Sequence, residues 1–146
     1  MFYGEFEHSL DRKNRVIIPA KFREALKDSF VEKFYITRGL DGCLFIFTEE
    51  EWKKQELKFK TLSFTKPDAR KFNRMFFSGA SEIVCDSQGR VLIPQYLRAF
   101  ADIQKDVVII GVSNRIEVWS KTRWKDFYEN TRETYEDTAE KLMGLD

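Results

Sequence analysis

Two arginines, Arg15 and Arg90, each follow a short polar turn that could hold a guanidinium group ready to bind an anion. The turns are Asp11–Asn14 and Asp86–Gly89. Aspartate at the start of such a turn accepts hydrogen bonds from the turn's own amides, and asparagine or glycine at its fourth position tolerates a positive φ. An arginine projecting from a rigid turn suits bidentate contacts with phosphate or with a guanine edge. From the spacing alone, a purely structural role is as strongly favoured as anion binding. In that role the aspartate and the arginine form an ion pair that only stabilises the turn.

The two turns belong to an internal duplication. The segment from Asp11 to Pro19 returns 75 residues later as Asp86 to Pro94, and six of the thirteen positions from Asp11 to Arg23 are identical to their counterparts. Unrelated segments would share roughly one, which indicates two copies of one supersecondary unit. The duplication predicts a pseudo-twofold domain in which each half buries the other's apolar face.

Each half is expected to fold as β-β-α-β-β, which gives a mixed α+β protein. Pro19 ends a strand and opens a short helix, because proline cannot donate to a sheet but suits the first turn of a helix. The predicted strands cover 4–10, 16–18, 34–37 and 44–47 in the first half and 81–85, 91–93, 107–110 and 116–119 in the second, with helices at 20–26 and 95–101.

Additional helices are expected outside the two repeats. Helices at 49–58 and 67–77 follow the first half, and one helix from residue 120 or 121 to about 142 follows the second, with an aromatic apolar side. We therefore divide the chain into a first repeat at 5–50, a helical linker at 51–78, a second repeat at 79–122 and a C-terminal helix at 123–146. The last helix is expected to pack on the core or on a neighbouring subunit.

Composition favours one soluble globular body. The chain has 146 residues, of which 42% are hydrophobic and 34% charged, as in folded domains of ordinary size. No apolar run approaches 18 residues and no signal-like start occurs, so neither a membrane span nor export is expected. Cys43 and Cys85 lack Cys-x-x-Cys spacing and are expected to be buried reduced thiols, which favours the cytoplasm. The 14 Phe residues are expected to fill a core or a subunit interface rather than to stack on bases.

Charge is sorted along the chain although the net charge is only +1. The segment 11–23 holds five cations against one anion, 53–74 holds eight against two, and 121–146 holds five cations and seven anions. Such sorting is what a protein with one polyanion-facing side would show. For 53–74, a charged helix face in the linker is favoured over a binding surface.

No catalytic, metal or cofactor site is predicted. His8 is the sole histidine and has no cysteine or acidic cluster at ligand spacing. Neither a Gly-x-Gly-x-x-Gly nor a Gly-x-x-x-x-Gly-Lys-Ser/Thr pattern occurs, so no nucleotide-binding loop is predicted. We therefore expect no enzyme, no cofactor and no small-molecule substrate.

Together with the two turns, the segments 37–44, 76–80 and 111–119 resemble the two halves of the MraZ family, bacterial proteins with duplicated SpoVT/AbrB-type domains. The resemblance covers nearly the whole chain and implies a swapped-hairpin β-barrel in which the two halves interlock. It places Arg15 and Arg90 at DNA, with Lys13 and Arg12 in support.

Two departures from the family pattern lie in the turns. The family's first turn usually has glycine where this chain has Asn14, and asparagine tolerates the same backbone. The second turn has Ser87 and Gln88 where the first has two cations, so the two turns need not contribute equally.

The same resemblance implies a ring-shaped homo-oligomer in the cytoplasm, associated with the nucleoid. It implies a sequence-specific regulator of transcription that binds promoter DNA at short direct repeats upstream of the division and cell-wall gene cluster. AbrB-type folds also serve as antitoxins that hold a partner enzyme, which gives a protein-interaction module as the alternative. An antitoxin would have a flexible C-terminal extension, whereas residues 121–146 look helical and aromatic, so DNA binding is preferred.

Overall fold

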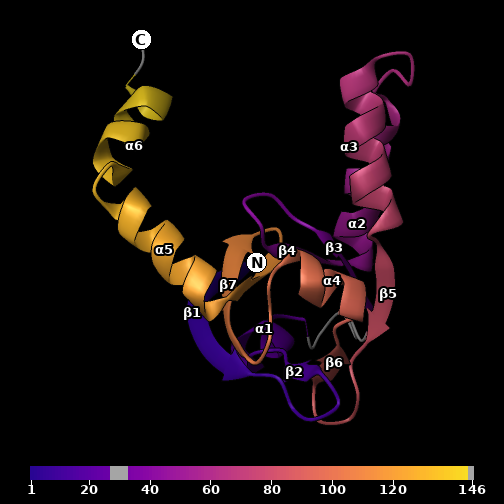
Figure 1. Cartoon of the computed structure of the whole chain (residues 1–146), viewed down its shortest axis with the longest axis vertical. Helices are drawn as coiled ribbons and strands as arrows, with labels where there is room; N and C mark the ends of the chain where they lie inside the picture. Colours follow the sequence, from indigo (N-terminus) through magenta and orange to yellow (C-terminus); the bar gives the residue numbers. More distant parts are fainter. Residues whose placement is uncertain (27–32, 145–146) are drawn as a thin grey trace.

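The computed structural model describes residues 1–26 and 33–144, which form two similar halves and two helical arms. The first half contains β1 (Phe2–Ser9), β2 (Arg15–Ile17), α1 (Ala20–Ala25), β3 (Lys33–Arg38) and β4 (Leu44–Thr48), followed by α2 (Glu49–Lys60) and α3 (Pro67–Ser78). The second half contains β5 (Ser81–Val84), β6 (Arg90–Leu92), α4 (Gln95–Phe100), β7 (Asp106–Ser113) and β8 (Ile116–Ser120), followed by α5 (Lys121–Arg132) and α6 (Tyr135–Met143). The arms α2–α3 and α5–α6 rise from one end of the molecule, and the loops beside β2 and β6 lie at the opposite end (Figure 1).

The strands form two antiparallel sheets that join the halves. The larger has six strands in the order β1-β7-β8-β4-β3-β5, and the smaller pairs β2 with β6. Four pairings cross between the halves: β1 with β7, β4 with β8, β5 with β3, and β2 with β6. The mixed α+β class is therefore confirmed. The larger sheet is not closed, since β1 and β5 are its two edge strands, and the expected barrel is not seen as a continuous hydrogen-bonded ring.

The six-stranded sheet separates two apolar clusters, because successive side chains of a strand point to opposite faces. In β4, Leu44 and Ile46 face a mainly aliphatic cluster that also holds Phe22 of α1 and Leu97 of α4. The side chains of Phe22 and Leu97 are almost fully buried, and burying a side chain of this size contributes about 1.5–3 kcal/mol to the stability of the fold. This cluster fixes α1, α4 and the small sheet beneath the large one, and so positions the two turns.

The other face of the large sheet carries an aromatic cluster. Phe45 and Phe47 of β4 point into it, and Trp52 of α2 stacks on Phe76 of α3 with ring centroids 5.4 Å apart. Trp119 of β8 meets Trp124 and Phe127 of α5, which anchors the base of the second arm. Many of the phenylalanines thus fill a core, as the composition predicted.

The C-terminal helix differs from its prediction. One helix was expected from residue 120 or 121 to about 142, but α5 ends at Arg132 and α6 begins at Tyr135. The backbone N–H and the hydroxyl of Thr134 both donate to the carbonyl of Thr131, at 3.1 and 3.2 Å. A threonine hydroxyl that bonds a nearby carbonyl competes with regular helix bonding, which explains the break.

Two smaller expectations concern membrane spans and the cysteines. Within 1–26 and 33–144, no helix is long and apolar enough to cross a membrane. Cys43 is fully buried, and burial raises the pKa of its thiol, whereas Cys85 is only half-buried. The burial predicted for both cysteines thus holds fully for Cys43.

Candidate nucleic-acid interface

The first turn is built around the carboxylate of Asp11. Its Oδ1 accepts hydrogen bonds from the backbone N–H groups of Lys13 and Arg15, both at 2.9 Å, and its Oδ2 accepts one from Nε of Arg15 at 2.8 Å. Asn14 takes a φ of 60°, and its N–H donates to the carbonyl of Asp11 at 3.0 Å. One side chain thus fixes both the path of the turn and the direction of the arginine that follows it.

The second turn repeats this arrangement atom for atom. Oδ1 of Asp86 accepts from the N–H groups of Gln88 and Arg90 at 2.9 Å, and its Oδ2 accepts from Nε of Arg90 at 2.8 Å. Gly89 stands in the position of Asn14 with a φ of 80°. Asn14 and Gly89 meet the same backbone requirement, since both tolerate the left-handed region.

These hydrogen bonds favour the ionised aspartates. The backbone N–H of Arg15 is the largest cause that holds the pKa of Asp11 below its ordinary value, and the side chain of Arg15 and the N–H of Lys13 add to it. The backbone N–H of Arg90 lowers the pKa of Asp86 in the same way. Partial desolvation opposes the shift at both positions without reversing it. Both carboxylates are therefore charged at neutral pH and hold their arginines by charge-assisted bonds.

The turns lie side by side because β2 and β6 pair with each other. The N–H of Ile18 donates to the carbonyl of Gly89 at 2.9 Å, and the N–H of Ile93 donates to the carbonyl of Asn14 at 3.1 Å. These reciprocal bonds run from the end of each short strand to the opposite turn. The fold therefore presents the two turns as one surface, the paired-turn surface, made of residues 11–15 and 86–90.

Arg15 and Arg90 each stabilise their own turn and are also accessible to a ligand. Their side chains are 26% and 27% exposed, and in each only Nε is bound by the aspartate of its own turn. A guanidinium carries five N–H donors, so both side chains keep terminal donors for a further acceptor, even though Nη1 of Arg15 also lies 3.8 Å from Oδ2 of Asp86. The ion pair that staples the turn thus also orients the arginine, and the two roles considered for it are compatible.

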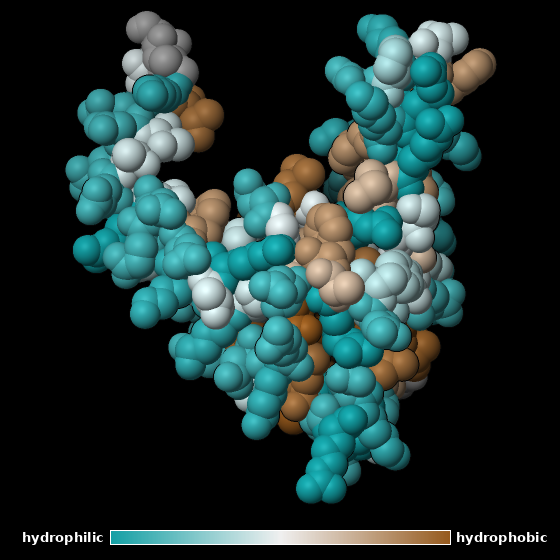
Figure 2. Space-filling view, viewed as in Figure 1, coloured by the Kyte–Doolittle hydropathy of each residue, from teal (hydrophilic) through white to brown (hydrophobic). Residues whose placement is uncertain are grey.

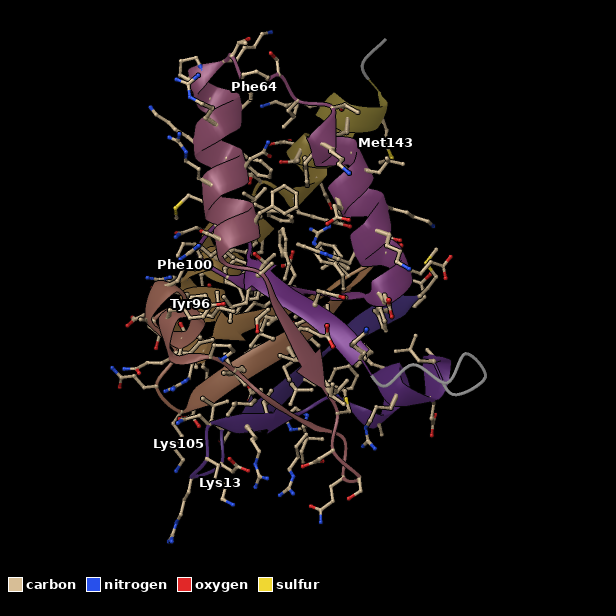
Figure 3. The ribbon with its side chains drawn as sticks, turned by 90° about the vertical axis from the view of Figure 1, so that its right-hand side faces the viewer. Lys13, Phe64, Tyr96, Phe100, Lys105 and Met143 are labelled. Carbon is tan, nitrogen blue, oxygen red and sulfur yellow. The ribbon has the colours of Figure 1, made fainter. Side chains whose placement is uncertain are left out.

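The two supporting cations stand at the tip of the first turn. Arg12 and Lys13 are both exposed, and Lys13 lies at the extreme end of the molecule in Figure 3. Ser87 and Gln88 occupy the same positions in the second turn and are also exposed. This end is strongly hydrophilic in Figure 2. Its positive charge is concentrated on the first turn.

Two further residues belong to this end, and sequence reasoning gave them no role. Nε of Arg23 donates to the carbonyl of Ile18 at 2.9 Å, and the same side chain lies against Gly89 of the opposite turn. The carbonyl of Lys105 accepts from the N–H of Leu10 at 2.8 Å, and Figure 3 shows the Lys105 side chain at the same end as Lys13. The repeat did contain a signal for Arg23, because Arg98 matches it and donates likewise to the carbonyl of Ile93 at 3.0 Å. Nothing in the sequence pattern pointed to Lys105.

The part of the chain that the structure describes holds no group of three or more His, Cys, Asp or Glu residues able to bind a metal ion. The paired-turn surface itself combines fixed donors with exposed cations. Such a surface can bind phosphate groups and can read base edges.

A protein-family model described as "MraZ protein, putative antitoxin-like" matches this chain twice, over residues 1–75 and 76–145. Each match contains one turn with its arginine. The two matches together span almost the whole chain and coincide with the internal duplication. The family is of a regulatory rather than an enzymatic type.

Proposed function

The chain belongs to the MraZ family, and from that premise we propose that it is a sequence-specific DNA-binding regulator of transcription. The DNA contact is assigned to the paired-turn surface. Following the family resemblance, the target is promoter DNA with short direct repeats upstream of the division and cell-wall gene cluster.

The observation that carries this proposal is the matched geometry of the two arginines. Arg15 and Arg90 are each held by an aspartate through Nε and through their own backbone N–H. A guanidinium held in this way loses little freedom on binding, which favours affinity. Two such groups on paired strands provide two contacts of fixed relative position, as reading a groove requires.

Exposed cations supply the part of the affinity that does not depend on base sequence. Arg12 and Lys13 are exposed in the first turn, and Figure 3 shows Lys105 as a further cation at the same end as Lys13. Each phosphate that such a side chain neutralises releases a condensed counterion. In this proposal the first turn contributes more phosphate contacts than the second.

The remaining expectations are part of the same proposal. The four strand pairings between the halves support an interlocked, swapped-hairpin arrangement of the repeats at 5–50 and 79–122. The protein forms a ring-shaped homo-oligomer, which repeats the paired-turn surface along the DNA. It acts in the cytoplasm on the nucleoid.

A protein-interaction module is the second candidate, and the words "antitoxin-like" in the family description favour it. In that case the paired-turn surface would serve the fold alone. Removing Arg12 and Lys13 would then leave partner binding intact.

The proposal is tested by fluorescence anisotropy with a labelled duplex taken from the region upstream of this protein's own gene. A shuffled duplex of the same length and composition is the control. We expect the upstream duplex to bind at least tenfold more tightly. Equal affinity for both duplexes would reject sequence-specific recognition, and no binding to either would favour the protein-interaction module.

A further inference from the structure

The arm formed by α2 and α3 carries an excess of positive charge that DNA contact at the paired-turn surface does not use. Its outer part, residues 57–71, holds five cations against one anion, and we call it the arm tip. Within the described residues none of these cations forms an ion pair. They are Lys58, Lys60, Lys66, Arg70 and Lys71. The arm tip therefore has a net positive charge that its own side chains do not neutralise.

The same tip also exposes apolar side chains. Leu57, Leu62 and Phe64 are 68%, 41% and 79% exposed. Figure 3 shows Phe64 at the outer end of the arm, opposite to Lys13, and Figure 2 shows apolar atoms among hydrophilic ones at this end of the arm. A single exposed apolar residue is ordinary on a protein surface, but three in one short segment, flanked by cations, form an amphipathic patch.

The loop that carries Phe64 is held in a fixed shape. Nη1 of Arg70 donates to the carbonyl of Phe64 at 3.0 Å, and the N–H of Leu62 donates to the carbonyl of Phe59 at 3.1 Å. The rings of Phe59 in α2 and Phe72 in α3 have centroids 4.7 Å apart and hold the two helices together. Because the loop is already ordered, it can present its apolar side chains to a partner at little entropic cost.

We propose that the arm tip docks on the surface of a lipid bilayer that contains anionic lipids. In this contact the cations lie at the lipid headgroups, and Leu62 and Phe64 enter the boundary between headgroups and acyl chains. Such a contact needs no spanning helix. It gives a role to the cation excess of residues 53–74, and it is independent of the proposed DNA contact, which lies at the opposite end of the molecule (Figure 1).

An anionic bilayer accounts for both features of the arm tip, whereas a nucleic acid accounts for one. A nucleic acid would pair with the cations and could stack a base on Phe64, but it would leave Leu57 and Leu62 in water. The bilayer interface accepts basic and apolar groups side by side and requires no matching shape for a projecting loop.

Flotation with lipid vesicles tests the proposal. The full chain should float with vesicles made of equal parts of phosphatidylcholine and phosphatidylglycerol, and it should stay in solution with vesicles of phosphatidylcholine alone. Phe64→Ser should weaken vesicle binding about tenfold, because it removes the most exposed apolar side chain of the tip. Tyr3→Ser, at an aromatic residue of β1 that is 65% exposed, is the matched control and should float like the wild type.

A charge variant tests the electrostatic part of the contact. Lys60→Gln/Lys66→Gln should weaken vesicle binding about 25-fold, because each cation near an anionic surface contributes about fivefold. The control Lys121→Gln/Lys125→Gln removes two exposed lysines from the other arm and should float like the wild type. All four positions are exposed, so thermal melts should show folded proteins throughout.

Phe64→Trp reports insertion directly. Its fluorescence should shift to shorter wavelength when the anionic vesicles are added. The fluorescence of the wild type should not shift, because Trp52 and Trp119 are buried and Trp124 is half-buried.

Three results would overturn the proposal. The first is equal flotation of Phe64→Ser and the wild type. The second is loss of vesicle binding in Arg12→Gln/Lys13→Gln with the arm tip intact, which would assign the lipid contact to the paired-turn surface. The third is a loss of affinity of Lys60→Gln/Lys66→Gln for the shuffled duplex but not for the vesicles, which would assign the tip to nucleic acid. None of these readouts requires sequence-specific DNA binding, so the proposed function and this inference can fail separately.

Discussion

Nη1 of Arg15 in the first turn lies 3.8 Å from Oδ2 of Asp86 in the second turn. That same oxygen accepts the 2.8 Å hydrogen bond from Nε of Arg90. Asp86 therefore touches both arginines, whereas the described contacts of Asp11 are confined to its own turn. The pseudo-twofold repeat is thus asymmetric at the paired-turn surface.

This asymmetry predicts different effects for the two aspartates. Asp86→Asn should weaken the positioning of both arginines, while Asp11→Asn should affect Arg15 alone. We expect Asp86→Asn to reduce affinity for the upstream duplex more than Asp11→Asn does. Anisotropy titrations of the two variants, run beside thermal melts, measure this. Equal losses of affinity would mean that the contact between Arg15 and Asp86 has no role in DNA binding.

Acid stability follows from the lowered pKa values of Asp11 and Asp86. A carboxyl group whose pKa is lower in the folded state stabilises the fold above its unfolded value, about 3.9, and this contribution is lost as pH falls through the folded value. The wild type should therefore lose stability as pH falls below about 4. The double variant Asp11→Asn/Asp86→Asn should start less stable and lose less over the same range.

Denaturant unfolding at pH 6 and at pH 3 checks the acid prediction. Asp126→Asn, an exposed position on α5, serves as the control for removal of a carboxylate. If the double variant has the acid dependence of the wild type, the turn carboxylates do not contribute to stability as described.

Arg15→Ala and Arg90→Ala should each weaken DNA binding without unfolding the protein. The aspartate of each turn keeps its bonds to backbone N–H groups when the arginine side chain is removed. Loss of one contact should cost about 1–3 kcal/mol of binding free energy per site. Arg132→Ala, at an exposed arginine on α5, should bind like the wild type. If both arginine variants also bind DNA like the wild type, these arginines only stabilise their turns.

Gly89→Ala should destabilise the second turn. The φ of 80° at this position costs an alanine about 1–2 kcal/mol, and the new Cβ would lie 2.6 Å from Nε of Arg23. The variant should therefore melt below the wild type and below Ser87→Ala, a change at an exposed position in the same turn. A melting temperature equal to that of Ser87→Ala would contradict the requirement for glycine.

Much of the local structure could be predicted because its causes are local. Pro19 opens α1 and Pro67 opens α3, and the strands of both repeats lie within a few residues of the expected ranges. Asn14 and Gly89 allowed the left-handed turns to be predicted, since few other residues take such a φ readily. The repeat also marked Arg15 and Arg90.

The features that sequence reasoning missed depend on contacts between distant segments. The approach of Arg15 to Asp86 follows from the pairing of β2 with β6, which no local pattern specifies. The packing of the Arg23 side chain against Gly89 depends on the same pairing of strands. The break between α5 and α6 has a local cause at Thr134, but the aromatic periodicity on either side concealed it.

The salt dependence of binding to the upstream duplex tests the central claim most directly. With about four phosphate contacts, log K should fall against log salt with a slope of roughly −3 to −4, and Lys13→Gln should make the slope shallower by about 1. Lys125→Gln, on the exposed side of α5, should leave the slope unchanged. A slope indistinguishable from zero in the wild type, or equal slopes for Lys13→Gln and the wild type, would contradict DNA binding through the paired-turn surface.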